Sequence, residues 1–483
     1  MAGRKAGLSE ARNVALDLVT ARRRRDAHMR DLLRGSYAFG KLSAQDRALA
    51  ARIALGATAA RGMLDRQISS HLSRGHLEPR VRDALEVAAY ELLFMKTPSA
   101  VVVSQGVELV RSVNPRAAGL ANAILHRIAD EDVPQMEKAR TLLATEPEKA
   151  DAATLALVGG LPSWLAGEIL SSVGPAKAAA LALAEKDPAP IYVAPNQALV
   201  DADELEHLLE EAGLAPKAAL LPGAFELGAP QGLSTSGLVQ DVVAVPSDLA
   251  AQAVAAIAAP RPGERFLEIG QGRATKTLLL LGARHELEEG DVAEPPLAAV
   301  ESEEFKAKIA RERLSHGWAG ASETFALDGR LLADEAKLPE GLRGAFDAVF
   351  LDAPCSGTGT LRRHPEIAWS LVEKSLNPED PDGLPALQLS LLEAAASRVR
   401  VGGRLIYATC SVLAQEDEDI VDAFLASDAG QGFKRMDARK TPGAAAAAGA
   451  LAPFIAEDGC LRTVPVPGGP DGHFCCVMQR VSG

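Results

Sequence analysis

The sequence is poor in cysteine and lacks long uncharged runs. Five cysteines in 483 residues are too few for a disulfide scaffold, and this usage is typical of a reducing compartment. The uncharged stretch 441–456 is mostly Ala and Gly with two prolines, which indicates a linker rather than a membrane span. Asp17 precedes any long apolar run, so no secretory signal is expected. We therefore expect a cytoplasmic protein without a membrane partner.

The net charge of −13 conceals an asymmetry. Residues 1–130 hold 21 Lys and Arg against 12 Asp and Glu, a balance of +9, whereas the remaining residues have a balance of −22. A basic front end on an acidic body favours contact between that front end and a polyanion such as nucleic acid. The alternative is a set of solvated helix faces, and charge alone does not decide between the two.

Apolar periodicity divides the chain into three predicted regions. Residues 1–135 show helical spacing and predict an all-α bundle. Residues 136–260 mix helical and strand patterns, which predicts a connector and a small α+β module. From 261 to 483, short apolar runs alternate with helical patterns, which predicts a parallel, doubly wound α/β sheet. Such sheets bind ligands at the carboxyl ends of their strands.

Two cysteines follow predicted strands of the α/β region. Cys355 lies three residues after Asp352 in the run LDAPCSGTG, and Cys410 lies in the run ATCS. Because parallel strands that flank one helix bring their carboxyl ends together, both thiols and the carboxylate are expected in one cleft.

The other three cysteines are interpreted as small buried hydrophobes. Cys475 and Cys476 are adjacent in a predicted strand, where alternation sends them to opposite faces. Together with Cys460 they do not have the spacing of a metal site, so no metal is predicted.

Two thiols and one acid suit the methylation of carbon 5 of cytosine, which is a poor nucleophile. A thiolate that adds to carbon 6 turns the ring into an enamine, and carbon 5 can then attack an electrophilic methyl group. An acid near N3 stabilises the charge that develops there, and a second thiol helps to release the product. Since a free thiol has a pKa of about 8.5, its surroundings must favour the thiolate.

A small-residue turn after the strand that ends near Ile269 is a candidate cofactor site. Gly270 and Gly272 let the backbone approach a ligand, and a helix that begins near Thr275 offers unpaired N–H groups. Glu301 and Asp328 end two later strands and suit hydrogen bonds to ribose hydroxyls and an adenine amine. For each acid, helix capping is the alternative interpretation unless the glycine turn, Glu301 and Asp328 converge at one site.

Basic and aromatic residues follow the first thiol. Arg362 and Arg363 are candidates for phosphate contact in RNA, and Trp369 for base stacking. Surface solvation and core packing are the alternatives.

The runs LDAPCSGTGTLRRHPEIAW and GGRLIYATCSVLAQEDEDIV resemble the two signature motifs of the RNA 5-methylcytosine methyltransferases, of the RsmB/Sun (Fmu) type. Members of that type carry a NusB-like helical RNA-binding domain, which the runs ALEVAAYELLFMKTPSAVVVSQGVELVR and GLANAILHRIA resemble. The resemblance implies S-adenosylmethionine as the cofactor, a Rossmann-like catalytic domain, and a cytosine in small-subunit (16S) ribosomal RNA as the substrate.

The resemblance also implies residue roles. Cys410 is the attacking nucleophile, Cys355 assists release of the product, and Asp352 contacts the cytosine ring close to the cofactor. The implied cofactor-binding residues are Gly270, Gln271, Gly272, Arg273, Ala274, Thr275, Lys276, Glu301, Asp328 and Asp352.

This chain departs from the family at two motifs. The family's Arg-x-Asn in the middle module is Ala194-Pro195-Asn196 here and lacks its Arg, and the other departure is in the first motif. The family's run resembles DLCAAPGGKT, whereas this chain has EIGQGRATKT, which places the β-branched Thr275 where Gly is usual and predicts crowding of the cofactor. The Glu-rich stretch 282–296 also predicts an altered connection. One alternative is therefore a non-catalytic RNA-binding or ribosome-assembly factor, and another is a transfer-RNA cytosine-C5 methyltransferase. A monomer is expected.

Overall fold

The computed structural model describes residues 7–25, 27–72, 76–286, 295–318, 320–447 and 449–482. Its contacts divide the chain into two units. The first comprises Met1–Pro188 and Thr360–Glu373, and the second comprises Ala189–Gly359 and Lys374–Gly483. Most of the predicted altered connection, residues 287–294, lies outside the described residues.

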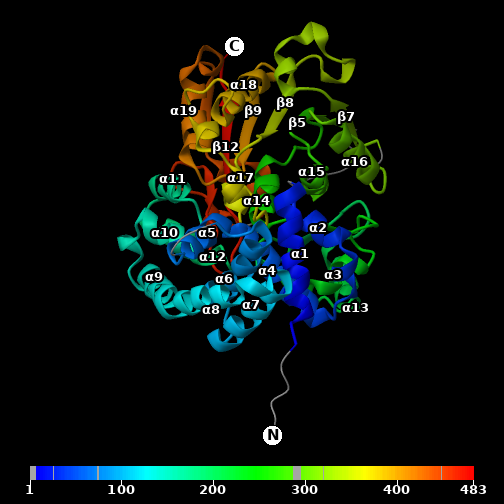
Figure 1. The fold of residues 1–483 in the computed structure, drawn as a ribbon. Helices are drawn as coiled ribbons and strands as arrows, with labels where there is room; N and C mark the ends of the chain where they lie inside the picture. Colours follow the sequence, from blue (N-terminus) through cyan, green and yellow to red (C-terminus); the bar gives the residue numbers. More distant parts are fainter. Residues whose placement is uncertain are drawn as a thin grey trace. The chain divides into compact units, whose positions relative to one another are not determined.

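Helices build the described part of the first unit (Figure 1). They are α1 (Glu10–Arg25), α2 (Met29–Gly35), α3 (Tyr37–Lys41), α4 (Ala44–Ala59), α5 (Arg61–Ser70), α6 (Pro79–Phe94), α7 (Ser99–Val113), α8 (Ala118–Arg127), α9 (Val133–Thr145), α10 (Ala152–Gly159), α11 (Ser163–Val173) and α12 (Pro175–Ala184). The periodic stretches of the sequence coincide with α1, α6 and α7, and the chain breaks between α7 and α8 at Asn114, whose side chain accepts a hydrogen bond from the Arg116 N–H. The prediction of an all-α front domain is confirmed.

Part of the basic charge of α1 is neutralised inside this unit. Asp83, Glu86 and Glu91 on α6 are buried. Arg23 contacts Asp83 at 2.6 Å and Glu86 at 2.8 Å, and Arg12 forms an ion pair with Glu91. Burial raises the pKa of Glu86 to about 7 despite the neighbouring Arg23. The number of basic residues therefore overstates how many free positive charges this unit presents to a polyanion.

A segment from the α/β part of the sequence belongs to the helical unit. We call Thr360–Glu373, which includes α17 (Ile367–Ser370), the strap. The indole N–H of Trp369 donates to the carbonyl oxygens of Ala59 at 3.0 Å and Gly160 at 3.1 Å. For Trp369 the packing alternative is therefore the one observed, because these bonds hold its ring within the unit.

The second unit begins with a small antiparallel sheet in the order β2-β3-β1-β4. Its elements are β1 (Tyr192–Pro195), α13 (Ala202–Glu211), β2 (Pro216–Ala218), β3 (Phe225–Leu227) and β4 (Ala244–Pro246). In the sequence, the apolar runs 191–196 and 221–228 and the helical pattern 202–213 coincide with β1, β3 and α13. The small α+β module is therefore present.

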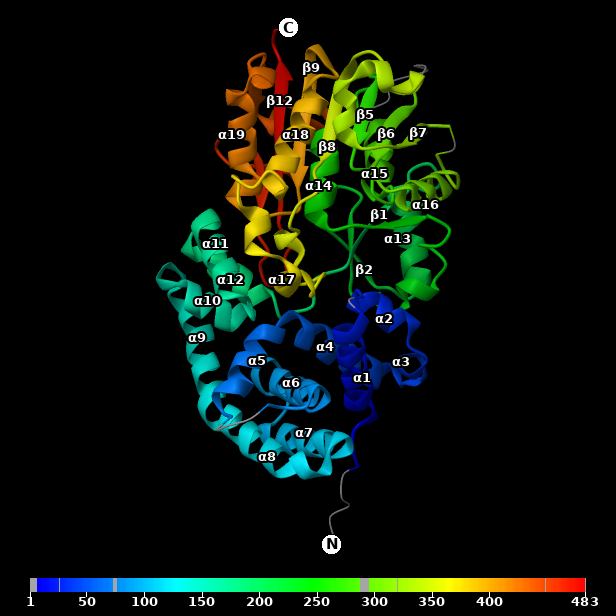
Figure 2. The same cartoon turned by 45° about the horizontal axis from the view of Figure 1, so that its top comes forward.

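The larger sheet has the order β10-β12-β9-β8-β5-β6-β7, which Figure 2 shows from β12 to β7. Pairing from β9 to β7 is parallel, whereas β12 and β10 join antiparallel. The elements are α14 (Leu249–Ala258), β5 (Phe266–Ile269), α15 (Thr275–Glu286), β6 (Leu297–Glu301), α16 (Glu304–Leu314), β7 (Ser322–Ala326), β8 (Phe346–Asp352), α18 (Leu384–Ala396), β9 (Val399–Thr409), α19 (Glu418–Ala426), β10 (Phe433–Met436), α20 (Pro442–Ala446), β11 (Leu461–Thr463) and β12 (His473–Arg480).

Helices cover both faces of this sheet, as predicted. Alternate strand residues pack with α14, α15 and α16 on one face and with α18 and α19 on the other. Cys475 joins the first core and Cys476 the second, so the predicted alternation is confirmed. The result is a parallel sheet buried on both sides, with its carboxyl edge free to bind a ligand.

The linker predicted at 441–456 is wrong. This stretch forms α20, and Ala444, Leu451 and Ile455 pack in the first core. Small apolar side chains leave no periodic signal, although they pack closely against α14.

In the described part of the chain, no single helix is both long and apolar enough to cross a membrane. One bent pair of helices, α10 with α11, is long and apolar enough when taken together, by length and composition only.

Candidate active site

A cavity of about 500 Å³ lies at the carboxyl edge of the parallel strands. Most of the residues predicted to do chemistry or to bind the cofactor line it: Gly270, Gly272, Lys276, Glu301, Asp328, Asp352, Cys355 and Cys410. Gln271, Arg273, Ala274 and Thr275, which were predicted with them, are not among the lining residues. The sheet topology thus gathers side chains that are up to 140 residues apart in sequence.

The two thiols meet because their strands are neighbours. β8 and β9 pair in parallel with Asp352 opposite Ala408, so Cys355 in the loop after β8 and Cys410 directly after β9 leave the same edge. Their Sγ atoms are 3.3 Å apart and both side chains are half-buried. The predicted convergence of both sulfur atoms on one cavity is therefore observed.

The surroundings distinguish the two thiols. The hydrogen bond with Cys410, burial and the negative charge of Cys410 raise the pKa of Cys355 well above its ordinary value. The hydrogen bond from Cys355 lowers the pKa of Cys410, and the positive charge of Lys276 acts in the same direction against burial. Of the two thiols, Cys410 is therefore the one that loses its proton more readily, and Cys355 the one that retains it more readily.

Lys276 and Asp352 form an ion pair beside the thiols. The Lys276 Nζ lies 2.7 Å from Asp352 Oδ2. Burial alone would lower the pKa of Lys276, but the charge and the hydrogen bond of Asp352 outweigh it and leave this pKa raised. Lys276 is thus a fixed positive charge in the first turn of α15, next to the cavity and the nucleophile candidate.

The turn between β5 and α15 depends on glycine at one close approach. Gly270 has φ 86°, and a Cβ there would lie 2.2 Å from the carbonyl oxygen of Asp352. Thr275 does not line the cavity, and its hydroxyl accepts a hydrogen bond from Arg313 Nη1 at 3.0 Å. The crowding of the cofactor expected from it remains a prediction. The chain therefore keeps the cavity open with glycines placed earlier in the turn.

The two predicted acids lie at the margin of the cavity. Glu301 accepts the N–H of Gly272 at 2.7 Å, which ties the end of β6 to the glycine turn. Asp328 accepts from the Arg330 N–H and guanidinium, which lowers the pKa of Asp328. The expected alternative, capping, is thus present at Asp328, and both acids still converge on the cavity.

Arg362 and Arg363 lie in the strap and not among the residues of the cavity. The Arg363 carbonyl accepts a hydrogen bond from Arg30 Nε at 2.8 Å within the helical unit. Their predicted contact with RNA remains a prediction.

A family model described as 16S rRNA methyltransferase RsmB/F matches residues 258–479, and a model of the NusB family matches residues 9–130. The ribosomal RNA small subunit methyltransferase B of Thermus thermophilus is 30% identical over 91% of this chain and 90% of its own length. The chain belongs to the RsmB/F family of 16S rRNA methyltransferases. The predicted enzyme class, methyltransferase, and the predicted cofactor, S-adenosylmethionine, are confirmed by this membership.

Further relatives agree with the family assignment. The ribosomal RNA small subunit methyltransferase B of Escherichia coli O6:K15:H31 is 28% identical over 80% of this chain and 83% of its own length. Among solved structures, the crystal structure of PH0851 superposes with a TM-score of 0.72 and 20% identity over 98% of this chain and 99% of that chain. This structural likeness shows the shared fold.

The residues of the cavity fit S-adenosylmethionine. A volume of about 500 Å³ is within the range of roughly 300–1,000 Å³ for small-molecule sites. The space around the missing Cβ of Gly272 is open, and acids suited to ribose and adenine stand at the ends of β6 and β7. This RsmB/F family member therefore retains a cofactor cavity despite its altered motif.

Sequence reasoning missed several residues at the site. Lys306, Arg330 and Glu303 also line the cavity, and Glu416 lies behind the thiol loops. The first three stand in charged stretches typical of solvated surfaces. Glu416 lies in the run QEDED beside a signature motif, where the sequence has no sign of which carboxylate turns inward.

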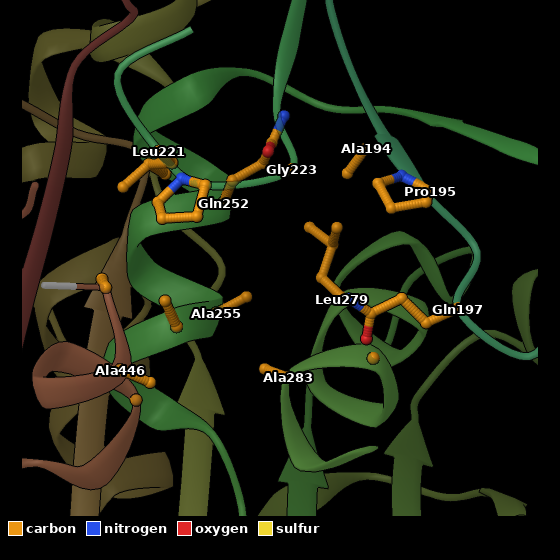
Figure 3. A pocket seen from close by; sticks show the side chains of 15 residues that line it. Ala194, Pro195, Gln197, Leu221, Gly223, Gln252, Ala255, Leu279, Ala283 and Ala446 are labelled. Atoms are coloured by element: carbon orange, nitrogen blue, oxygen red, sulfur yellow. The ribbon is translucent and has the colours of Figure 1, made fainter. Parts of the chain in front are cut away.

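Figure 3 shows a second, smaller hollow of about 100 Å³ in the same unit. Ala194 and Pro195 of β1, Gln252 of α14, Ala283 of α15 and Ala446 of α20 border it. None of the described residues that line it is titratable, so the chemistry is assigned to the larger cavity.

Proposed function

We propose that this protein methylates carbon 5 of one cytosine in small-subunit (16S) ribosomal RNA, with Cys410 as the nucleophile. The observation that carries the proposal is the pair of sulfur atoms 3.3 Å apart beside the Lys276–Asp352 ion pair. Both relatives are named ribosomal RNA small subunit methyltransferase B, which supports ribosomal RNA as the substrate.

In the first step the Cys410 thiolate adds to carbon 6 of the cytosine and its electron pair forms the C–S bond. The π bond between carbons 5 and 6 breaks, and its electron pair shifts onto carbon 5 and N3. Asp352 contacts the cytosine ring, and the positive charge of Lys276 beside it stabilises the negative charge that develops at N3. S-adenosylmethionine supplies the electrophilic methyl group that carbon 5 attacks. Cys410 is thereby joined to the RNA through a C–S bond, and carbon 5 carries both a proton and the new methyl group.

In the second step Cys355 takes the proton from carbon 5, and the C–S bond breaks to return Cys410 as a thiolate. In the free protein the pKa of Cys355 is raised by its hydrogen bond with Cys410, by burial and by the charge of Cys410. Covalent bonding of Cys410 removes the hydrogen bond and the charge, so the pKa of Cys355 falls and its own proton leaves to solvent. The Cys355 thiolate is then the base that takes the proton from carbon 5.

The test is transfer of tritium from methyl-labelled S-adenosylmethionine to RNA that lacks the modification. Free small-subunit ribosomal RNA, assembled subunits and transfer RNA form three arms. We expect incorporation into ribosomal RNA as 5-methylcytosine. No incorporation by folded protein in any arm contradicts methyltransfer, and preference for transfer RNA favours that alternative.

One observation favours a second candidate, a non-catalytic RNA-binding or assembly factor. Ala274 has φ 62° in the altered turn, a conformation that L residues rarely adopt. Calorimetry distinguishes the two candidates: micromolar binding of S-adenosylmethionine supports the enzyme, whereas RNA binding without cofactor binding supports the factor.

The remaining assignments concern the whole chain. We propose that residues 1–135 bind RNA, with 136–260 as connector and α+β module and 261–483 as catalytic domain, and that Arg362 and Arg363 contact RNA phosphates. Retention of a basic helical front supports this division. We also propose a cytoplasmic monomer, which light scattering and fractionation test.

A further inference from the structure

One buried carboxylate lies between the two loops that carry the thiols. Glu416 ends the short helical turn Ala414–Glu416 between β9 and α19, and it is fully buried. It does not line the cofactor cavity, so it is placed behind the reacting atoms and not among them.

Four neutral donors surround this carboxylate. Glu416 Oε1 accepts from the Ser356 N–H at 2.7 Å and from Gln388 Nε2 at 3.1 Å. Glu416 Oε2 accepts from the hydroxyls of Ser356 and Ser411, the latter at 2.6 Å. Burial of a charge is tolerated when hydrogen bonds saturate it in this way.

The position of these donors in the sequence is informative. Ser356 directly follows Cys355, and Ser411 directly follows Cys410. A third hydroxyl, that of Thr358, lies 3.0 Å from Ser411 Oγ and joins the same network. One side chain thereby ties together the two loops whose relative position sets the distance between the sulfur atoms.

Further hydrogen bonds hold Glu416 in place. The Tyr407 hydroxyl donates to the carbonyl oxygen of Glu416 at 2.6 Å. Gln388 also donates to the Pro354 carbonyl at 2.9 Å, in the loop just before Cys355. Glu416 is therefore anchored to β9 through its backbone carbonyl and to α18 through its carboxylate, and both are elements of the sheet and its cover.

We propose that Glu416 is a positioning residue that fixes the Cys355 and Cys410 loops at the separation the two thiols need to act on one base. The expected effect on catalysis rests on the proposed function. The geometric part of the inference concerns only the separation of the two sulfur atoms. A misplacement of about 1 Å near the reacting atoms costs about a hundredfold in rate, which is the effect expected when this carboxylate is lost.

The test compares Glu416→Gln with the wild-type full chain in two measurements. We expect the kcat for RNA methylation to fall about a hundredfold, while S-adenosylmethionine binds within about twofold because no cavity residue has changed. Glu418→Gln, two residues away on α19, is the matched control, and its kcat should equal that of the wild type.

The second measurement is the pH profile of iodoacetamide alkylation of Cys410, read by peptide mass spectrometry without RNA. Loss of the negative charge alone would move the midpoint to lower pH. Loss of the Cys355–Cys410 hydrogen bond moves it to higher pH, as in Cys355→Ala. We expect the higher midpoint in Glu416→Gln and no further rise in the double variant.

An unchanged or lower midpoint together with wild-type kcat overturns the inference. If Glu416→Gln does not fold, Ser356→Ala and Ser411→Ala each remove one hydroxyl, and wild-type profiles in both would overturn it equally. Failure of the wild-type protein to methylate RNA contradicts the proposed function instead, and the alkylation result still decides the role of Glu416.

Discussion

At the scale of single residues, the site depends on two thiols that are hydrogen-bonded to each other. Their mutual hydrogen bond raises the pKa of Cys355 and lowers that of Cys410, and the positive charge of the nearby Lys276 lowers the pKa of Cys410 further. The sequence motifs alone imply the roles by resemblance, whereas the direction of the two pKa shifts is an independent physical reason for the same assignment.

The two roles predict opposite behaviour of two variants. Cys355→Ala should accumulate a covalent RNA–protein adduct, since Cys410 still attacks while release stalls. Cys410→Ala should be inactive and form no adduct. Denaturing electrophoresis with labelled RNA measures both, and an adduct with the Cys410 variant would reverse the assignment.

Lys276 supports the thiolate through its charge. Replacing it by Met removes a positive charge that lowers the pKa of Cys410, so the alkylation midpoint of Cys410 should move to higher pH. Lys306→Met, which also removes a cation at the cavity margin, is the control. Equal shifts in both variants would argue against a specific role for Lys276.

At the scale of elements, β5 carries a buried acid that makes stability depend on pH. Burial, opposed by the hydrogen bond from the Thr277 hydroxyl, raises the pKa of Glu268 to about 8 from an ordinary value of 4.5. The neutral form is therefore favoured in the folded state. Its contribution to stability is complete below pH 4.5 and is lost as the pH rises through about 8.

Glu268→Gln should remove this dependence, because the amide stays neutral and can still bond to Thr277. Relative to the wild type, the free energy of unfolding of the variant should rise by up to roughly 1.4 kcal/mol per pH unit within that window. Denaturant unfolding from pH 5 to pH 9 measures it. Glu323→Gln on β7, an exposed position of the same sheet, controls for loss of one negative charge. Parallel curves for wild type and Glu268→Gln would contradict the prediction.

At the scale of the whole molecule, the two units do not correspond to two continuous stretches of chain. The strap leaves the second unit at Gly359, four residues after Cys355, and returns to it at Lys374. Within the helical unit, a Cβ on Gly62 of α5 would lie 2.0 Å from the ring of Trp369. The helical unit therefore depends on a part of the catalytic signature motif for its own packing.

A pair of glycine variants tests this packing. Gly62→Ala should destabilise the full chain by about 1–3 kcal/mol, because the hydrogen-bonded indole cannot move aside. Gly119→Ala on α8 meets nothing within 4 Å and should stabilise by up to about 1 kcal/mol through helix propensity. Thermal unfolding measures both, and a gain in stability for Gly62→Ala would show that the strap is not held as described.

Local pattern was enough to predict the elements and the edge where the site lies. α15 begins at Thr275 as expected from the sequence, β1, α13 and β3 occur where their patterns were seen, and Cys355 and Cys410 follow β8 and β9. The linker at 441–456 was wrong, since alanine-rich chain has no periodic signal whether it is exposed or packed.

The sequence by itself determined the alternation of strands and helices, the family, and the two thiols at the ends of parallel strands, because these depend on local spacing and on the register of neighbouring strands. Only the tertiary structure decided which charges are neutralised inside α1 and α6, where the strap packs, and that the carboxylate of Glu416 turns inward to join both thiol loops. Those features depend on which side chains, distant in sequence, are buried together. The identity of one residue does not specify which residues it contacts.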